Sequence, residues 1–126
     1  MLDVMHLIQV ALRATDLDRA EDFYRRLLRQ APTGRFDPPG LLFFDLGGTR
    51  LLLEGNAPAS MLYLGVDDVR ALVEELRPTV EVRAEPHLIF THPDDRLGPA
   101  GTEEWQAFIV DSEGNLVGLA TQYPAG

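Results

Sequence analysis

The sequence predicts an α+β fold of two tandem βαβββ modules whose sheets form a cupped pocket. A strand-like segment, an acidic helix cap and an amphipathic helix occur twice in that order, and aligning Asp16 with Asp68 superimposes the two copies. Each helix is followed by further strand-like segments with apolar residues on both faces. Each sheet can therefore pack its helix on one face and line the pocket with the other.

The first module is expected to cover residues 5–55 and to begin with a strand over residues 7–14. Asp16 follows this strand, and its carboxylate can accept hydrogen bonds from the first turn of a helix. The helix that it caps carries one apolar stripe at three- and four-residue spacing. The stripe consists of Leu17, Ala20, Phe23, Tyr24, Leu27 and Leu28.

Two strands are expected after this helix, over residues 40–46 and 49–54, and Gly47-Gly48 forms the turn between them. Glycine suits this turn because hairpin loops often need backbone angles that other residues avoid. Residues 56–60 then form a short linker to the second module.

The second module is expected to cover residues 60–122 and to repeat the same order, with a strand over residues 61–66 and Asp68 as the helix cap. Pro78 ends this helix because a proline disfavours helical geometry at the residue before it. The apolar stripe of the helix consists of Val69, Leu72, Val73 and Leu76.

Strand-like segments follow the second helix as well, over residues 80–84, 87–91, 105–111 and 116–121. Residues 112–115 form a turn, and the residues from 94 to 102, rich in glycine and proline, form the longest loop. The two modules are expected to make one domain over residues 1–126, because a chain of this length is too short for two independent domains.

Composition excludes several classes of protein. The formal net charge of −9 and the pI near 4.6 would repel a phosphate backbone, so we expect no nucleic-acid partner. No apolar run approaches the ~18 residues of a membrane span, so we expect no membrane association. Cysteine is absent, which excludes disulfides and thiolate metal ligands. The beginning of the chain shows no targeting signal, and we expect a cytoplasmic protein.

Two segments, VALRATDLDRAEDFY over residues 10–24 and FIVDSEGNLVGL over residues 108–119, are similar to the vicinal oxygen chelate superfamily. That superfamily includes glyoxalase I, methylmalonyl-CoA epimerase, extradiol dioxygenases and bleomycin-resistance proteins. Together with the duplicated βαβββ order, the resemblance covers nearly the whole chain. It implies the fold and a homodimer, but one fold supports many chemistries, so it does not specify the function.

The resemblance also implies where a catalytic divalent metal would bind in the enzymes of the superfamily. The metal would hold two neighbouring substrate oxygens and stabilise developing charge. Its ligand positions fall on Gln9, Leu52, Met61 and Gly118. Glutamine can bind such a cation, but leucine and glycine offer no donor and the methionine thioether is too soft. Three of the four ligands are missing, so we expect no metal cofactor.

A divalent metal stays an alternative if a small shift in alignment brings Gln9 and Glu54 together, although two ligands alone rarely make a tight site. Strand alternation puts His6 on the face opposite Gln9. His87 and His92 are five residues apart, so a regular strand would point them to opposite faces as solvated strand-end residues. Either could serve as a hydrogen-bond donor or general base if it faced the pocket.

We therefore expect a glyoxalase/bleomycin-resistance-like protein that sequesters a small molecule without a metal. No catalytic residue is assigned, and the negative net charge would attract a cationic ligand. The alternatives are a divalent-metal-dependent lyase, isomerase or dioxygenase related to glyoxalase I or methylmalonyl-CoA epimerase, and a regulatory module with a vestigial pocket. The expected ligand-binding residues are Gln9, Arg13, Leu52, Glu54, Met61, Tyr63, His87, Trp105 and Gly118.

Overall fold

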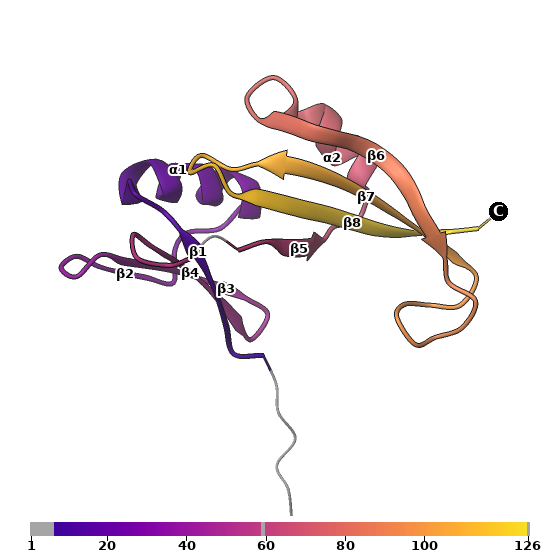
Figure 1. Cartoon of the computed structure of the whole chain (residues 1–126), viewed down its shortest axis with the longest axis horizontal. Coiled ribbons are helices and arrows are strands. Elements are labelled where there is room, and N and C mark those ends of the chain that lie inside the picture. Colours follow the sequence, from indigo (N-terminus) through magenta and orange to yellow (C-terminus); the bar gives the residue numbers. More distant parts are fainter. Residues whose placement is uncertain (1–6, 59, 126) are drawn as a thin grey trace, which may run out of the picture. The chain divides into compact units, whose positions relative to one another are not determined.

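The computed structural model describes residues 7–58 and 60–125 and divides into two compact units (Figure 1). Unit 1 comprises the chain up to Ser60 together with residues 112–115, and unit 2 comprises residues 61–111 and 116–126. The division falls at the end of the predicted linker. Residues 5 and 6 of the predicted first module, including His6, lie outside the described residues.

Sheet A lies in unit 1 and has the strand order β1-β4-β3-β2. Strand β1 runs parallel to β4, whereas the other two pairs are antiparallel. The strands are β1 (Gln9–Arg13), β2 (Gly34–Phe36), β3 (Leu41–Leu46) and β4 (Thr49–Glu54). The sequence did not predict the position of β2, because this strand has only three residues, begins with glycine and shows no apolar alternation.

Helix α1 (Leu17–Leu28) covers one face of sheet A (Figure 1). The predicted cap is confirmed, since the Asp16 carboxylate accepts a hydrogen bond from the backbone N–H of Arg19 at 3.0 Å. The helix buries Ala20 and Tyr24 completely, and the Tyr24 ring lies 6.2 Å from the ring of Phe44 on β3. The sheet residues with no exposed surface on this side are Leu12, Leu42, Phe44, Leu51 and Leu53.

The opposite face of sheet A carries a different set of side chains, and we call it the open face of sheet A. Strand register places Gln9 beside Arg50, Arg13 beside Glu54, and Phe43 beside Leu52. Partners in register point to the same side of a sheet, so all six belong to this face. Unlike the helix side, it is polar at both ends and apolar between them.

Glu113, in the turn that belongs to unit 1, holds the beginning of α1. Its Oε1 accepts from the backbone N–H groups of Thr15 at 2.9 Å and Asp16 at 3.0 Å, while Oε2 accepts from Nε of Arg19 at 2.6 Å. Burial raises the pKa of Glu113, but these three donors outweigh burial and bring the pKa down to about 2. The side chain is 1% exposed, so this ionised carboxylate is an internal part of unit 1.

Unit 2 repeats the arrangement with sheet B, whose strand order is β5-β8-β7-β6. Strand β5 runs parallel to β8, and the other pairs are antiparallel, as in sheet A. The elements are β5 (Leu62–Gly65), α2 (Val69–Leu76), β6 (Glu81–Thr91), β7 (Thr102–Val110) and β8 (Leu116–Pro124). The two strands expected over residues 80–84 and 87–91 are one strand, β6, interrupted by irregular register.

Helix α2 begins as predicted, with the Asp68 carboxylate accepting from the backbone N–H of Ala71 at 3.2 Å. Asp68 also accepts from the Tyr123 hydroxyl at 2.6 Å, and the backbone N–H of Val69 donates to Thr121 Oγ1 at 2.9 Å. Strand β8 therefore holds the first turn of α2 against sheet B. Neither helix in the described part of the chain has the length and apolar character needed to cross a membrane.

Replacing Glu113 with glutamine should lower the free energy of unfolding by about 1–3 kcal/mol, because a buried charged acceptor is lost from two backbone N–H groups. The matched control is Glu74→Gln, which breaks the exposed 2.8 Å ion pair between Glu74 and Arg77 and should change stability far less. Denaturant unfolding of both variants measures the difference. Equal losses would contradict the role assigned to Glu113.

The same contacts make stability depend on pH. The pKa of Glu113 is about 2 in the folded chain, below its ordinary value of 4.5. A carboxyl group whose pKa is depressed by folding stabilises the folded state while it is ionised. Its contribution is therefore complete above about pH 5 and is lost as the pH falls from about 5 to about 2. Across this range the unaltered protein should lose stability more steeply than Glu113→Gln.

Candidate functional site

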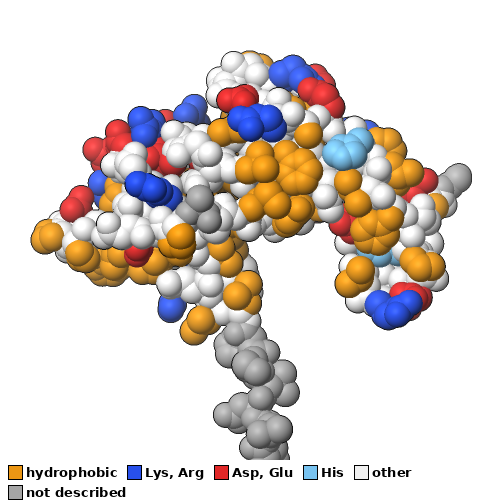
Figure 2. All heavy atoms as spheres, viewed as in Figure 1, with side chains coloured by type: hydrophobic (Ala, Val, Ile, Leu, Met, Phe, Trp, Pro, Cys, Tyr) orange, Lys and Arg blue, Asp and Glu red, His pale blue; other side chains and the backbone are white. Residues whose placement is uncertain are grey.

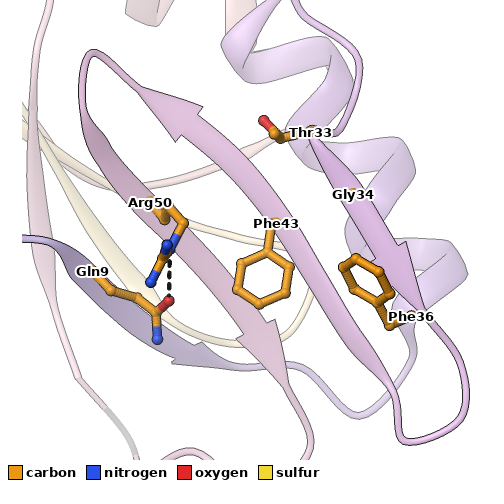
Figure 3. Close-up of a pocket in the computed structure, with 6 residues that line it drawn as sticks. All are labelled: Gln9, Thr33, Gly34, Phe36, Phe43 and Arg50. Atoms are coloured by element: carbon orange, nitrogen blue, oxygen red, sulfur yellow. Dashed lines mark hydrogen bonds between the residues drawn. The ribbon is translucent and has the colours of Figure 1, made fainter.

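A recess of about 380 Å³ opens on the open face of sheet A (Figure 3). Phe36 and Phe43 form its apolar floor, with their ring centroids 6.0 Å apart and their planes at 72°. The recess is lined by Gln9, Thr33, Gly34, Phe36, Phe43 and Arg50, and we call it the sheet A recess. Its size falls within the range of small-molecule pockets.

Gln9 and Arg50 form the polar edge of the sheet A recess. Nε of Arg50 donates to Oε1 of Gln9 at 3.0 Å, and both side chains point to the side of the sheet that carries Phe43 (Figure 3). This bond fixes the orientation of the glutamine amide, because its oxygen must face the guanidinium donor and its NH₂ group must point elsewhere. Gln9 was predicted as a site residue, whereas Arg50 was not, because no motif or alternation pattern pointed to it.

Three other predicted site residues lie on the same face but outside the recess. Leu52 sits in the middle of β4 and is 6% exposed. Arg13 and Glu54 are register partners at the far ends of β1 and β4. Gln9 pairs with Arg50, four residues before Glu54, so Gln9 and Glu54 stand roughly 13 Å apart along the strands. Strand register therefore does not bring Gln9 and Glu54 together as the alternative required.

The residues present do not fit the divalent metal that the resemblance implies. A glutamine binds a cation through its carbonyl oxygen, and in Gln9 that oxygen is taken by the positively charged guanidinium of Arg50. Leu52 has no donor atom. Among residues 7–58 and 60–125, no group of three or more histidine, aspartate or glutamate side chains is arranged to hold a metal ion. We therefore derive no chemical step through a metal.

In unit 2, the ring of Tyr63 covers the backbone of Gly118. Tyr63 on β5 is the register partner of Gly118 on β8, and a methyl group added at Gly118 would lie 2.5 Å from Cδ2 of Tyr63. The Tyr63 ring meets Phe108 edge-on at 5.8 Å. Apolar side chains gather over the strands of sheet B (Figure 2). The space that a ligand side chain at Gly118 would need is therefore filled by an aromatic ring.

Met61 and Trp105 were also expected in the site. Met61 precedes β5 and is 43% exposed. Trp105 is the register partner of Thr121, whose hydroxyl accepts from the first turn of α2, so Trp105 lies on the helix side of sheet B and away from Tyr63. The guanidinium of Arg70 stacks over the indole at 4.0 Å. In this position Trp105 packs against α2 and does not reach the face of sheet B that carries Tyr63.

His87 on β6 and His92, which follows directly after this strand, differ from expectation because the strand is irregular. A register shift between Leu88 and Phe90 breaks the alternation that would separate His87 from His92. His92 is not a solvated strand-end residue: it is 2% exposed. His87 is exposed, with Nδ1 lying 2.8 Å from the backbone oxygen of Glu85.

A partly buried cluster of polar side chains around Glu104 was not predicted from the sequence. Nε2 of His92 donates to Glu104 at 2.9 Å, and the amides of Gln106 and Gln122 donate to the same carboxylate at 2.7 and 3.2 Å. Burial raises the pKa of Glu104, but these donors lower it further than burial raises it. Glu104 was not selected because the strand was expected to begin at Trp105. The alternation of residues 104, 106 and 108 would have placed Glu104 on the face of sheet B that carries Phe108.

The fold is shared with several solved structures. A glyoxalase/bleomycin resistance protein/dioxygenase superfamily member from Sphaerobacter thermophilus superimposes with a TM-score of 0.71 and 16% identity, over 94% of this chain and 98% of its own. A glyoxalase/bleomycin resistance protein/dioxygenase from Alicyclobacillus acidocaldarius gives 0.64 and 19%, over 94% and 92%. One from Nocardioides gives 0.68 and 14%, over 100% and 89%.

These likenesses confirm the expected fold and nothing beyond it, because the sequence identities are only 14–19%. No protein-family model matches the sequence, and no curated protein matches it significantly. The chain thus has two βαβββ units with the glyoxalase/bleomycin-resistance/dioxygenase fold. Because this fold supports many functions, the function must be inferred from the side chains of this protein.

Replacing Gly118 with alanine should destabilise the protein by about 1–2 kcal/mol, because the new methyl group displaces the Tyr63 ring. In a Tyr63→Ala background the same replacement should cost about 1 kcal/mol less, since the obstacle is gone and alanine suits a strand better than glycine. Denaturant unfolding of the two single variants and the double variant measures the coupling. Additive effects would show that the ring does not cover Gly118.

Proposed function

We propose that this chain is a metal-independent protein that binds and sequesters a small organic molecule, with the sheet A recess as its binding site. The observation that supports the proposal is the combination of an aromatic floor, Phe36 and Phe43, with the single polar edge formed by Gln9 and Arg50. Small-molecule sites have this composition: apolar walls supply most of the contact area, and a few polar groups orient the ligand.

Burial of apolar area supplies the driving force. The side chain of Phe36 is 56% exposed, so an occupant that covers it removes aromatic surface from water. Covering a benzyl side chain contributes on the order of 1–2 kcal/mol per ring, and a stacked aromatic occupant adds about 0.5–1.5 kcal/mol. Two such rings suffice for binding in the micromolar to millimolar range before polar contacts are added.

The alternative is a metal-dependent enzyme, and the side chains at the expected metal-ligand positions do not favour it. The four positions that would hold the cation carry Gln9, Leu52, Met61 and Gly118. The one oxygen among them is engaged by Arg50, and the glycine lies under Tyr63. A sequestering protein needs no group to move a proton or stabilise an oxyanion, so the same residues suit it.

The proposal extends to the setting in which the protein works. We infer a cytoplasmic homodimer with no nucleic-acid partner, from the resemblance, from the absence of cysteine and from the formal net charge of −9. Light scattering should therefore give a solution mass of twice the chain mass of 14.0 kDa. A mass equal to one chain at micromolar concentration would contradict the dimer, but the proposed binding site does not depend on that result.

Binding is best tested with two simple probes, 1-naphthamide and 1-naphthoate, at up to millimolar concentration. Both should shift the backbone amide signals of Gly34 and Phe43 in ¹⁵N–¹H spectra. Phe43→Ala should weaken binding about tenfold because it removes half of the aromatic floor. The matched control is Phe23→Ala, which truncates a half-buried phenylalanine on α1, and should leave the affinity within about twofold.

Metal dependence is tested on the same samples. Protein purified without chelator should contain no stoichiometric divalent metal, and treatment with EDTA should leave probe affinity within about twofold. Stoichiometric metal, or binding that disappears with EDTA and returns with the metal, would support the enzyme alternative. If neither probe shifts the signal of any residue that lines the recess, the proposed site is wrong.

A further inference from the structure

The polar edge of the sheet A recess presents hydrogen-bond donors and no acceptor. Nε of Arg50 is used by Gln9, which leaves the two terminal guanidinium nitrogens. These make no hydrogen bond or ion pair with any side chain in the described part of the chain. The Gln9 amide nitrogen is likewise left as a donor, because its oxygen faces Arg50. An occupant that meets this edge must therefore bring acceptors.

Charge pairing elsewhere in the molecule distinguishes Arg50 from most of the other arginines. Those with a carboxylate partner within 4.0 Å are Arg19, Arg25, Arg26, Arg35, Arg77, Arg83 and Arg96. Arg13, Arg50 and Arg70 have no such partner among the described carboxylates. The Arg70 guanidinium stacks over the rings of Trp105 and Tyr123, whereas Arg13 and Arg50 lie on the open face of sheet A. The chain has 20 acidic residues and 11 arginines, so most arginines find a carboxylate partner. A guanidinium without one, beside an apolar recess, distinguishes the open face of sheet A.

Asp45 is the one carboxylate in register with Arg50 on the neighbouring strand β3. Its Oδ1 accepts from the backbone N–H of Gly48 at 3.1 Å, and it makes no ion pair with Arg50. Asp45 reduces the positive potential at the edge but leaves the guanidinium donors unoccupied. Its removal should therefore strengthen the binding of an anion.

We propose that the sheet A recess selects a small aromatic carboxylate, whose ring lies on Phe36 and Phe43 and whose two oxygens accept from the terminal nitrogens of Arg50. This inference rests on the proposed function and names its ligand class. The end of a guanidinium presents two parallel N–H groups at the spacing of carboxylate oxygens, which makes the contact bidentate and stronger than a neutral hydrogen bond. The bond to Gln9 holds the guanidinium in place and lowers the entropy lost on binding.

The test compares three probes that share one ring system and differ in charge: 1-naphthoate, 1-naphthamide and 1-naphthylmethylammonium. At pH 7 these are anionic, neutral and cationic. Titration followed by ¹⁵N–¹H spectra gives each dissociation constant and shows whether the probe sits at Gly34 and Phe43. The carboxylate should bind about tenfold more tightly than the amide, and the ammonium should bind least, because a charge-assisted bidentate contact is gained only by the carboxylate.

Variants assign the preference to Arg50. Arg50→Gln should reduce the carboxylate-to-amide ratio to about twofold or less, because it removes the charge-assisted contact that only the carboxylate gains, and Arg50→Lys should give an intermediate ratio because a lysine lacks the planar pair of donors. The matched control is Arg83→Gln, which removes an exposed positive charge from β6 and changes the net charge equally. It should retain the ratio of the unaltered protein. Asp45→Asn should raise the ratio.

The outcomes separate this inference from the proposed function. If no probe shifts the recess signals, the proposed function fails and the ligand class fails with it. If carboxylate and amide bind equally, or the ammonium binds most tightly, the recess is a binding site but the inference is overturned. A preference for the carboxylate that survives Arg50→Gln also overturns it, because the anion would then be held elsewhere.

Discussion

The parallel pairing of β1 with β4 sets the character of the open face of sheet A. It puts Gln9 beside Arg50, where the guanidinium takes the amide oxygen at 3.0 Å. That single bond removes the atom a metal would need and fixes a pair of cationic donors at the edge of an aromatic floor. The same face could have carried a cation site or an anion site, and the proposed preference for an anion rests on this contact.

Local geometry and overall charge point to different ligands. The formal net charge of −9 suggested a cationic ligand, because a negative field attracts cations at long range. Contacts act at a few ångströms, however, and beyond about 10 Å that field is largely screened at ordinary ionic strength. Several acidic residues are engaged with arginines on the surface, whereas Arg50 faces the recess with its terminal donors unused. The proposed preference of the recess for an anion therefore rests on the nearby donors of Arg50 and not on the net charge of the chain.

The sequence predicted best what depends on neighbours along the chain. Asp16 and Asp68 cap their helices as expected, because a cap needs only the following turn. Strand alternation correctly put Gln9 and Arg13 on one face. It failed for His87 and His92, because the bulges in β6 arise from pairing with β7 and leave no mark in the sequence pattern. The role of Arg50 was hidden for the same reason: it depends on register between strands about 40 residues apart.

A crystal structure of the protein grown with 1-naphthoate and a divalent cation would show most directly whether the edge of the sheet A recess binds the oxygens of an anion in place of a metal. We expect the carboxylate at hydrogen-bonding distance from both terminal nitrogens of Arg50, with the naphthalene ring over Phe43. A divalent ion coordinated by Gln9, with Arg50 turned away from the recess, would contradict it.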